Sequence, residues 1–218
     1  MSNTARELIA AVQAYPGVTL VAVSKAVGLP EIKLAYEMGI SNFGENRVQD
    51  ALPKIEQCIL PLTWHFIGRV QTNKLRKIVG SFSLVHSLCS LRVAEEMSKV
   101  AQAEGKVFTC LIQVDTTDEE TKQGLRPDEV GPFIDSLAGM KAVAIKGLMT
   151  MGPNTADKEM IRQSFRQVRQ LYDELSREKW PAVEMRHLSM GMSSDYRLAL
   201  DAGSNMVRIG TAIFANIK

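Results

Sequence analysis

Cysteine is scarce in this sequence, and long hydrophobic runs are absent. The three cysteines, Cys58, Cys89 and Cys110, lie far apart and form no Cys-x-x-Cys pair, which argues against a disulfide framework and a structural zinc site. No apolar run approaches the roughly 18 residues needed to cross a membrane. The first residues also lack the basic stretch and apolar run of a secretory signal. We therefore expect a cytoplasmic protein without a membrane span.

An excess of charge of either sign is also lacking. Lysine and arginine number 26 and aspartate and glutamate 24, which gives a formal net charge of +2. Nothing in this balance indicates a nucleic-acid or anionic-membrane partner. The basic segment 69–77 has no interleaved aromatic residues and is interpreted as a helix face. His65, His86 and His187 show no metal-ligand spacing, so we expect hydrogen-bonded core or rim residues and no metal.

Apolar, strand-like runs recur along the whole chain and alternate with helical patterns. The strands are predicted at residues 18–24, 42–46, 62–68, 84–88, 107–114, 145–151, 184–192 and 205–214. An opening helix is predicted at about residues 3–14. A later helix carries the apolar stripe from Met160 to Leu175, with Asn154 or Thr155 as its cap and Asp157 in its first turn. Strand then helix, repeated, predicts parallel strands with helical crossovers.

Two architectures fit this alternation: an open doubly wound sheet and a closed barrel. An open sheet commonly has a glycine-rich nucleotide turn after its first strand, but residues 24–28 form no such motif. Eight strands in 218 residues average about 27 residues per unit, which is typical of a compact barrel. We predict one α/β domain over residues 1–218, a single (β/α)8 TIM barrel with an extra N-terminal helix.

The active face of such a barrel lies at the carboxyl ends of its strands. Lys25 follows the first predicted strand directly. A lysine there is expected to be desolvated, which favours a neutral amine that can attack an aldehyde and form a Schiff base. The alternative is a lysine that merely extends to solvent at the barrel rim.

Small residues and hydroxyls follow the last two predicted strands, where barrels often bind phosphate. Ser189, Gly191 and Ser193 follow the seventh strand, and Gly210 and Thr211 lie on the eighth beside Arg208. Freed backbone N–H groups, hydroxyls and a guanidinium can together surround a dianion. The alternative is that the glycines serve tight turns and that Arg208 pairs with a carboxylate. Together, a first-strand lysine and a late phosphate cup suggest pyridoxal 5′-phosphate.

Several motifs that support this hypothesis are distributed along nearly the whole chain. They are Ala-Val-Ser-Lys at 22–25, Phe-Gly-Glu-Asn-Arg-Val-Gln at 43–49, Trp-His-Phe-Ile-Gly-Arg-Val-Gln-Thr-Asn-Lys at 64–74, Gly-Leu-Met-Thr-Met at 147–151, Leu-Ser-Met-Gly-Met-Ser at 188–193 and Val-Arg-Ile-Gly-Thr-Ala-Ile-Phe at 207–214. In this combination the sequence resembles the pyridoxal-phosphate-binding homeostasis proteins, also called the proline synthase co-transcribed family.

The resemblance implies a barrel similar to the N-terminal domain of alanine racemase, with Lys25 forming the internal aldimine. Arg208 would lie near the pyridine nitrogen, keep it largely unprotonated and weaken the ring as an electron sink. The resemblance also implies that Asn46 faces the cofactor. The implied phosphate cup comprises Ser189, Gly191, Ser193, Gly210 and Thr211.

The sequence also departs from both families. Racemases of this type use a tyrosine from a second β-domain, yet the sequence ends at Lys218, just past the last predicted strand. No tyrosine follows Lys25 closely, and Met151 stands where racemases place a histidine against the ring. Many homeostasis proteins have a basic residue where this chain has Val27. Lys122 matches a basic position of that family at the rim of the site. The alternative is that Lys122 is an ordinary solvated lysine in a loop.

These features lead to a ranked set of hypotheses. The first is a non-enzymatic protein of vitamin B6 and amino-acid homeostasis that holds pyridoxal phosphate on Lys25 and supplies apo-enzymes. The second is a weak amino-acid racemase or related fold-type III enzyme with the same lysine. The third is a class I aldolase barrel, although aldolase lysines usually lie on later strands. We expect a monomer.

Overall fold

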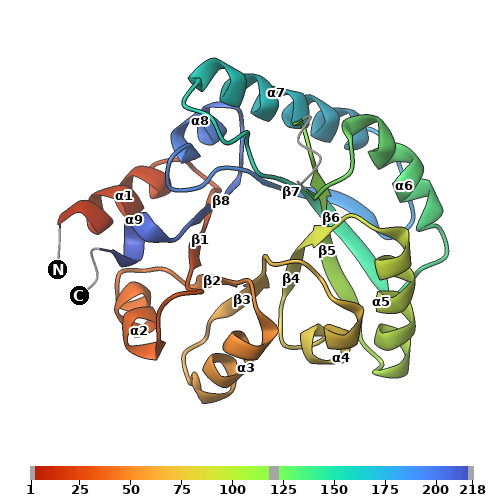
Figure 1. Ribbon diagram of the computed structural model, residues 1–218, viewed down its shortest axis with the longest axis horizontal. Coiled ribbons are helices and arrows are strands. Elements are labelled where there is room, and N and C mark those ends of the chain that lie inside the picture. Colours follow the sequence, from red (N-terminus) through yellow and green to blue (C-terminus); the bar gives the residue numbers. More distant parts are fainter. Residues whose placement is uncertain (1–2, 118–122, 216–218) are drawn as a thin grey trace.

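Eight parallel strands close into a barrel with the order β1 to β8 in the computed structural model, which describes residues 3–117 and 123–215. The helices form a ring outside the strands (Figure 1). The strands are β1 (Thr19–Val23), β2 (Asn42–Glu45), β3 (Thr63–Phe66), β4 (Leu84–Leu88), β5 (Phe108–Val114), β6 (Val143–Thr150), β7 (Val183–Ser189) and β8 (Met206–Ile209). The predicted TIM barrel is confirmed.

The helices follow the strands in the predicted alternation. They are α1 (Asn3–Gln13), α2 (Leu29–Glu37), α3 (Val48–Gln57), α4 (Leu75–Ile78), α5 (Leu91–Ala103), α6 (Val130–Ser136), α7 (Lys158–Leu175), α8 (Tyr196–Asp201) and α9 (Thr211–Phe214), with 3₁₀ turns η1 (Thr72–Lys74) and η2 (Pro127–Glu129). The predicted extra helix is α1, which precedes β1 and contacts α9, so the first and last helices meet on one side of the barrel (Figure 1).

Apolar side chains fill two layers. The larger layer lies between the strands and the helices, where Phe43, Phe66 and Phe165 are almost completely buried. A smaller cluster comprises Val21, Leu84, Leu111, Met149 and Met206. Side chains two positions apart on a strand share one face, so Leu84 with His86, and Met206 with Arg208, share the inner face of the barrel. The interior is therefore apolar in part and polar in part.

Three local predictions were wrong. The last strand ends at Ile209 rather than Phe214, because Gly210 leaves the extended conformation (φ −113°, ψ −80°) and α9 begins at Thr211. The N-cap of α7 is Asp157, whose Oδ1 accepts the amide protons of Glu159 and Met160 at 2.8 and 3.3 Å. A carboxylate at this position accepts hydrogen bonds from two free N–H groups, and its negative charge interacts favourably with the positive end of the helix dipole.

The third concerns the basic segment 69–77, which is not one helix face. Arg69 lies in the loop after β3, Lys74 ends η1, and only Arg76 and Lys77 belong to α4. Among the described helices, none is long and apolar enough to span a membrane. No group of three or more His, Cys, Asp or Glu in residues 3–117 and 123–215 is arranged to hold a metal ion.

Candidate functional site

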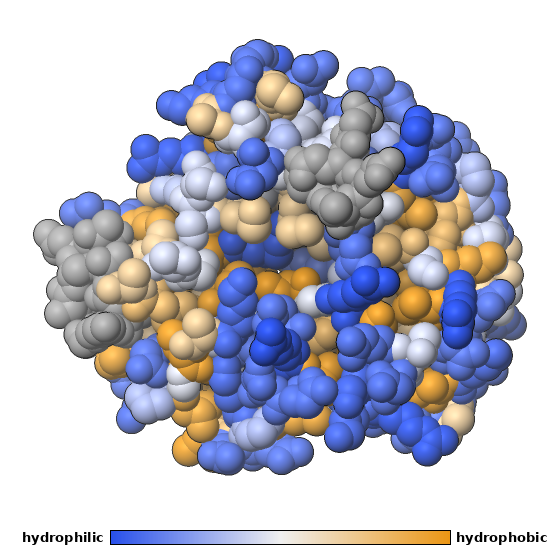
Figure 2. All heavy atoms as spheres, viewed as in Figure 1, coloured by the Kyte–Doolittle hydropathy of each residue, from blue (hydrophilic) through white to orange (hydrophobic). Residues whose placement is uncertain are grey.

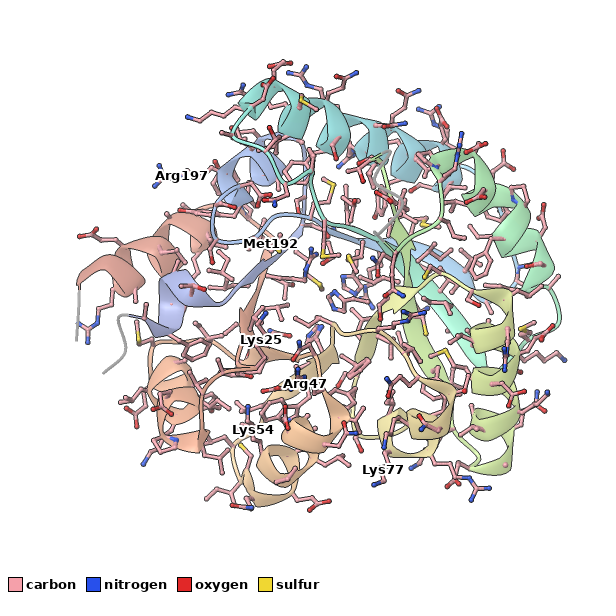
Figure 3. All side chains as sticks on the ribbon, viewed as in Figure 1. Lys25, Arg47, Lys54, Lys77, Met192 and Arg197 are labelled. Carbon is pink, nitrogen blue, oxygen red and sulfur yellow. The ribbon has the colours of Figure 1, made fainter. Side chains whose placement is uncertain are left out.

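Lys25 lies at the mouth of the barrel, two residues past the end of β1. Strand β1 is a buried apolar strand, and the Ser24 amide continues its pairing by donating to the Gly44 carbonyl of β2 at 3.0 Å. Lys25 itself is exposed, so the expectation that its amine would be desolvated is wrong. Its side chain points toward the centre of the mouth (Figure 3). It lines a cavity of about 370 Å³ together with Met192, Arg208, Gly210 and Thr211.

A buried ion pair lies directly behind Lys25. Lys54 of α3 donates from Nζ to the Ser24 carbonyl oxygen and to Glu45 Oε1, both at 2.8 Å. The Ser24 hydroxyl donates to the same carboxylate oxygen at 2.6 Å, and the Glu45 side chain is fully buried. The residue before Lys25 is thereby tied to both β2 and α3. This clamp was missed from the sequence, although a glutamate at the end of a buried strand already required a cationic partner.

Arg208 forms the buried wall of the same cavity and comes from β8. Its Nη1 donates to the Ser189 carbonyl and hydroxyl oxygens at 2.9 and 2.6 Å, and its Nη2 donates to the Thr150 carbonyl at 2.8 Å. Burial lowers the pKa of Arg208 to about 10, against the opposing effect of Asp195, so the group remains a cation at neutral pH. These contacts engage three of the five N–H groups of a guanidinium.

A chain of buried polar side chains continues from Arg208 through the barrel. The Ser189 hydroxyl lies 3.2 Å from His86 Nδ1, His86 Nε2 lies 2.9 Å from His65 Nδ1, and His65 Nε2 lies 3.1 Å from Asn42 Oδ1. Burial lowers the pKa of His65 to about 4 and holds that of His86 well below its ordinary value. Both imidazoles are therefore neutral at pH 7, which agrees with the expectation of hydrogen-bonded core residues.

The loop after β7 approaches Arg208 through its backbone. The Arg208 amide donates to the Gly191 carbonyl at 3.0 Å. Gly191 has a φ of +93°, and a Cβ there would lie 2.6 Å from the Ala199 Cβ, so this position requires glycine. Asp195 closes the loop, since its Oδ1 accepts the Met192 amide proton at 2.6 Å. Burial raises the pKa of Asp195, partly offset by that amide and by Arg208.

The structure brings together only part of the predicted site. Lys25, Arg208, Gly210 and Thr211 line the cavity at the mouth. Ser189 lies beneath it, with its hydroxyl engaged by Arg208 and His86. Sequence reasoning missed Asp195, Met192 and the Lys54 clamp.

The remaining predicted residues lie around that cavity. Ser193 is half-buried and does not line it. Met151 lines a neighbouring cavity of about 780 Å³, which also includes Met192 and Asp195. Asn46 lines a third cavity, beside β2 and β3. Lys122 lies outside the described residues.

Comparison with known proteins first defines the class. The family model of the alanine racemase N-terminal domain matches residues 2–216, which include every strand of the closed barrel described above. A solved alanine racemase of Clostridium difficile has a similar barrel, with a TM-score of 0.80 at 14% identity over 97% of this chain and 56% of the racemase. At that identity the likeness concerns the fold alone.

Other relatives are much more similar. A pyridoxal phosphate homeostasis protein of Aquifex aeolicus is 41% identical over 91% of this chain and 87% of its own length. A pyridoxal phosphate homeostasis protein of Synechocystis is 36% identical over 92% of this chain and 92% of its own length. The solved structure of PipY from Synechococcus elongatus with pyridoxal phosphate bound has a TM-score of 0.87 at 34% identity, covering 96% of this chain and 99% of PipY. The chain belongs to the family of pyridoxal phosphate homeostasis proteins.

Proposed function

We propose that this chain binds pyridoxal 5′-phosphate at the barrel mouth, holds it covalently on Lys25 and acts as a carrier in vitamin B6 homeostasis. One observation supports this most: a single cavity joins an exposed lysine amine to Arg208, Gly210 and Thr211. An amine suits the aldehyde of this cofactor, and a cation with hydroxyl and amide donors suits its anionic groups. The names of the relatives and the cofactor-bound PipY structure support the same assignment.

The cofactor supplies an aldehyde and an electron-withdrawing pyridine ring when it is bound. Lys25 would hold the cofactor through Nζ, since a primary amine is the group that suits an aldehyde. The clamp of Lys54 on Ser24 and Glu45 fixes the backbone that carries this amine. Because Lys25 is exposed, the bond is open to water and to competing amines, which suits a protein that must release its ligand.

Arg208 would contact the pyridine nitrogen with the N–H groups that Ser189 and Thr150 do not engage. A guanidinium is a donor only, so it leaves that nitrogen unprotonated and the ring a weak electron sink. The phosphate would lie against the loops that follow β7 and β8, where Gly191, Ser193, Gly210 and Thr211 offer N–H and O–H donors. Asn46 and Met151 would approach the cofactor from the sides.

A carrier fits the cavity better than a catalyst. Among the described residues that line it, the titratable ones are Lys25 and Arg208. Racemisation needs an acid and a base on opposite faces of the substrate, and a guanidinium with a pKa of about 10 is a poor base at neutral pH. We therefore infer that the chain holds and exchanges the cofactor, and that PLP-dependent apo-enzymes are its recipients.

The direct test compares cofactor retention in Lys25→Ala with that in the wild-type chain. After loading and gel filtration, we expect the visible absorption band of bound pyridoxal phosphate in the wild type and none in Lys25→Ala, with unchanged circular dichroism. Lys77→Ala is the matched control, because Lys77 is exposed on α4 and lines none of the three cavities discussed above. Equal retention in Lys25→Ala would overturn the assignment.

A second measurement separates carrier from catalyst. The loaded chain is incubated with alanine in deuterated water, and exchange of the α-proton is followed by NMR. We expect no exchange above that of free pyridoxal phosphate. Exchange that is rapid in the wild type and lost in Lys25→Ala would instead identify an enzyme.

A further inference from the structure

The tripeptide Arg-Val-Gln occurs twice, at residues 47–49 after β2 and at residues 69–71 after β3. In both copies the valine is buried, Val48 at 3% and Val70 at 7% exposure. The flanking arginine and glutamine are more accessible than the valine in both copies. The valines therefore fasten each loop to the core, and the polar side chains remain available. Neither copy belongs to the cavity that contains Lys25.

Both copies line one cavity of about 450 Å³. Its lining residues outside the two copies are Asn46, Asp50, Phe66 and Lys74. Three cations and one carboxylate therefore face a common space. Within the described residues, Arg47, Arg69 and Lys74 form no ion pair. Hydrophilic side chains dominate the surface over α3 and α4, below the central hollow in Figure 2.

The backbone holds the two loops at a fixed separation. Gly68, just before Arg69, lies so close to the Asn46 carbonyl that any Cβ there would overlap the carbonyl oxygen. The Ser87 hydroxyl of β4 donates to the Gly68 carbonyl and anchors this contact to the barrel. Because Asn46 and Gly68 immediately precede the two arginines, their backbone positions are set before any ligand arrives. A preorganised set of donors loses less entropy on binding.

We propose that this cavity is a second ligand site, which binds a small phosphate monoester. Two guanidiniums and one ammonium match a phosphate dianion in charge and geometry. The start of the ten-residue helix α3, which has no side-chain cap, adds to the positive potential. Gln49 and Gln71 supply hydrogen bonds to the rest of the ligand. A volume of about 450 Å³ suits a small molecule rather than the surface of a protein.

The test follows backbone amide NMR shifts while inorganic phosphate, or phenyl phosphate as a monoester, is added at constant ionic strength. We expect saturable shifts at Val48, Gln49 and Gln71. The double variant Arg47→Gln, Arg69→Gln should weaken binding about ten-fold or more, because two charge-assisted contacts are lost. Lys77→Gln, which removes an exposed cation outside the cavity, should bind as the wild type does. The amide shifts of Gly191 and Gly210 report phosphate binding at the Lys25 site. Loss of binding at one site can therefore be distinguished from loss of binding at the other.

Three results would overturn the proposal. The first is an equal shift produced by chloride alone. The second is unchanged phosphate binding in the double variant, whose folding the same spectra verify. The third is saturation by a pentaglutamate peptide but not by phosphate or phenyl phosphate, which would assign the cavity to an acidic protein segment. Arg47 and Arg69 are both exposed, so each can also be substituted alone without disturbing the core.

Discussion

Arg208 Nη1 lies 2.6 Å from the hydroxyl oxygen of Ser189, and this contact joins the arginine to a directed chain of hydrogen bonds. The chain is directed from its far end: Asn42 Oδ1 only accepts, so His65 donates from Nε2, and because both imidazoles are neutral His86 donates from Nε2 to His65 Nδ1. The Ser189 hydroxyl therefore donates to His86 Nδ1 while its oxygen accepts from Arg208. The wall of the proposed cofactor site is thus continuous with a hydrogen-bond chain that reaches the start of β2.

Ser189→Ala interrupts this chain at its first link. We expect the free energy of unfolding to fall by about 1–3 kcal/mol, because His86 Nδ1 and one N–H of Arg208 lose a buried partner. Arg208 keeps the carbonyl contacts to Ser189 and Thr150, so the fold remains and cofactor affinity decreases. Urea titration and cofactor binding measure the two effects. Ser176→Ala, at the exposed end of α7, is the control, and equal effects of both substitutions would contradict the prediction.

Stability should fall as the pH falls from about 6.5 to about 4. In the unfolded chain His65 takes up a proton near its ordinary pKa, whereas in the folded chain its pKa is about 4. The unfolded state therefore binds more protons in this window. His65 lowers the free energy of unfolding by up to about 1.4 kcal/mol for each pH unit, and His86 lowers it further. Urea titrations at about pH 7 and about pH 5 measure the difference. Equal stabilities would show that these histidines are not held neutral.

Lys54→Met removes the cation of the clamp behind Lys25. Glu45 would then keep a buried carboxylate with only the Ser24 hydroxyl as partner, so we expect a loss of about 3–5 kcal/mol. The double variant Lys54→Met, Glu45→Gln should recover part of this loss, because no buried charge remains. Lys99→Met breaks the exposed pair with Glu96 and should leave stability unchanged. An equally small effect of Lys54→Met would mean that the clamp does not fix the Lys25 loop.

Two glycines with nearly the same φ separate backbone strain from steric overlap. Gly139 has a φ of +91° and nothing within 4 Å of the place a Cβ would take, whereas at Gly191, with a φ of +93°, that place lies 2.6 Å from Ala199 Cβ. Gly139→Ala should cost about 1–2 kcal/mol from the backbone alone. Gly191→Ala should cost about 1–3 kcal/mol more. It should also displace the loop that meets Arg208 and lower cofactor binding, which Gly139→Ala should not. Thermal unfolding and absorption spectra measure both.

The barrel could be predicted because each strand is a short apolar run between helical patterns, and that signal is local. The end of β8 was missed for a related reason: residues 212–214 are apolar, and an apolar run alone does not separate a strand from a short helix. The cap of α7 was misplaced because Asn154, Thr155 and Asp157 all suit a cap, and only the backbone decides which one reaches the free amides.

The convergence of Lys25, Arg208, Gly210 and Thr211 on one cavity was predictable, because the carboxyl ends of barrel strands meet at one face. The remaining contacts of the site depend on the direction of side chains from strands that are far apart in the sequence. Ser189 was expected at a phosphate, yet its hydroxyl lies between Arg208 and His86. The Lys25 amine was expected to be desolvated, because a buried strand precedes it, but Lys25 is exposed. No pattern within one strand contains this information.

The most direct test of the central claim is borohydride reduction of the loaded wild-type chain, followed by mass mapping of its peptides. Reduction converts the bond between the lysine nitrogen and the cofactor carbon to a stable amine, so the attachment point survives digestion. We predict that the cofactor is found on the peptide that contains Lys25. Labelling spread over surface lysines, or centred on another residue such as Lys54 or Lys74, would contradict the account.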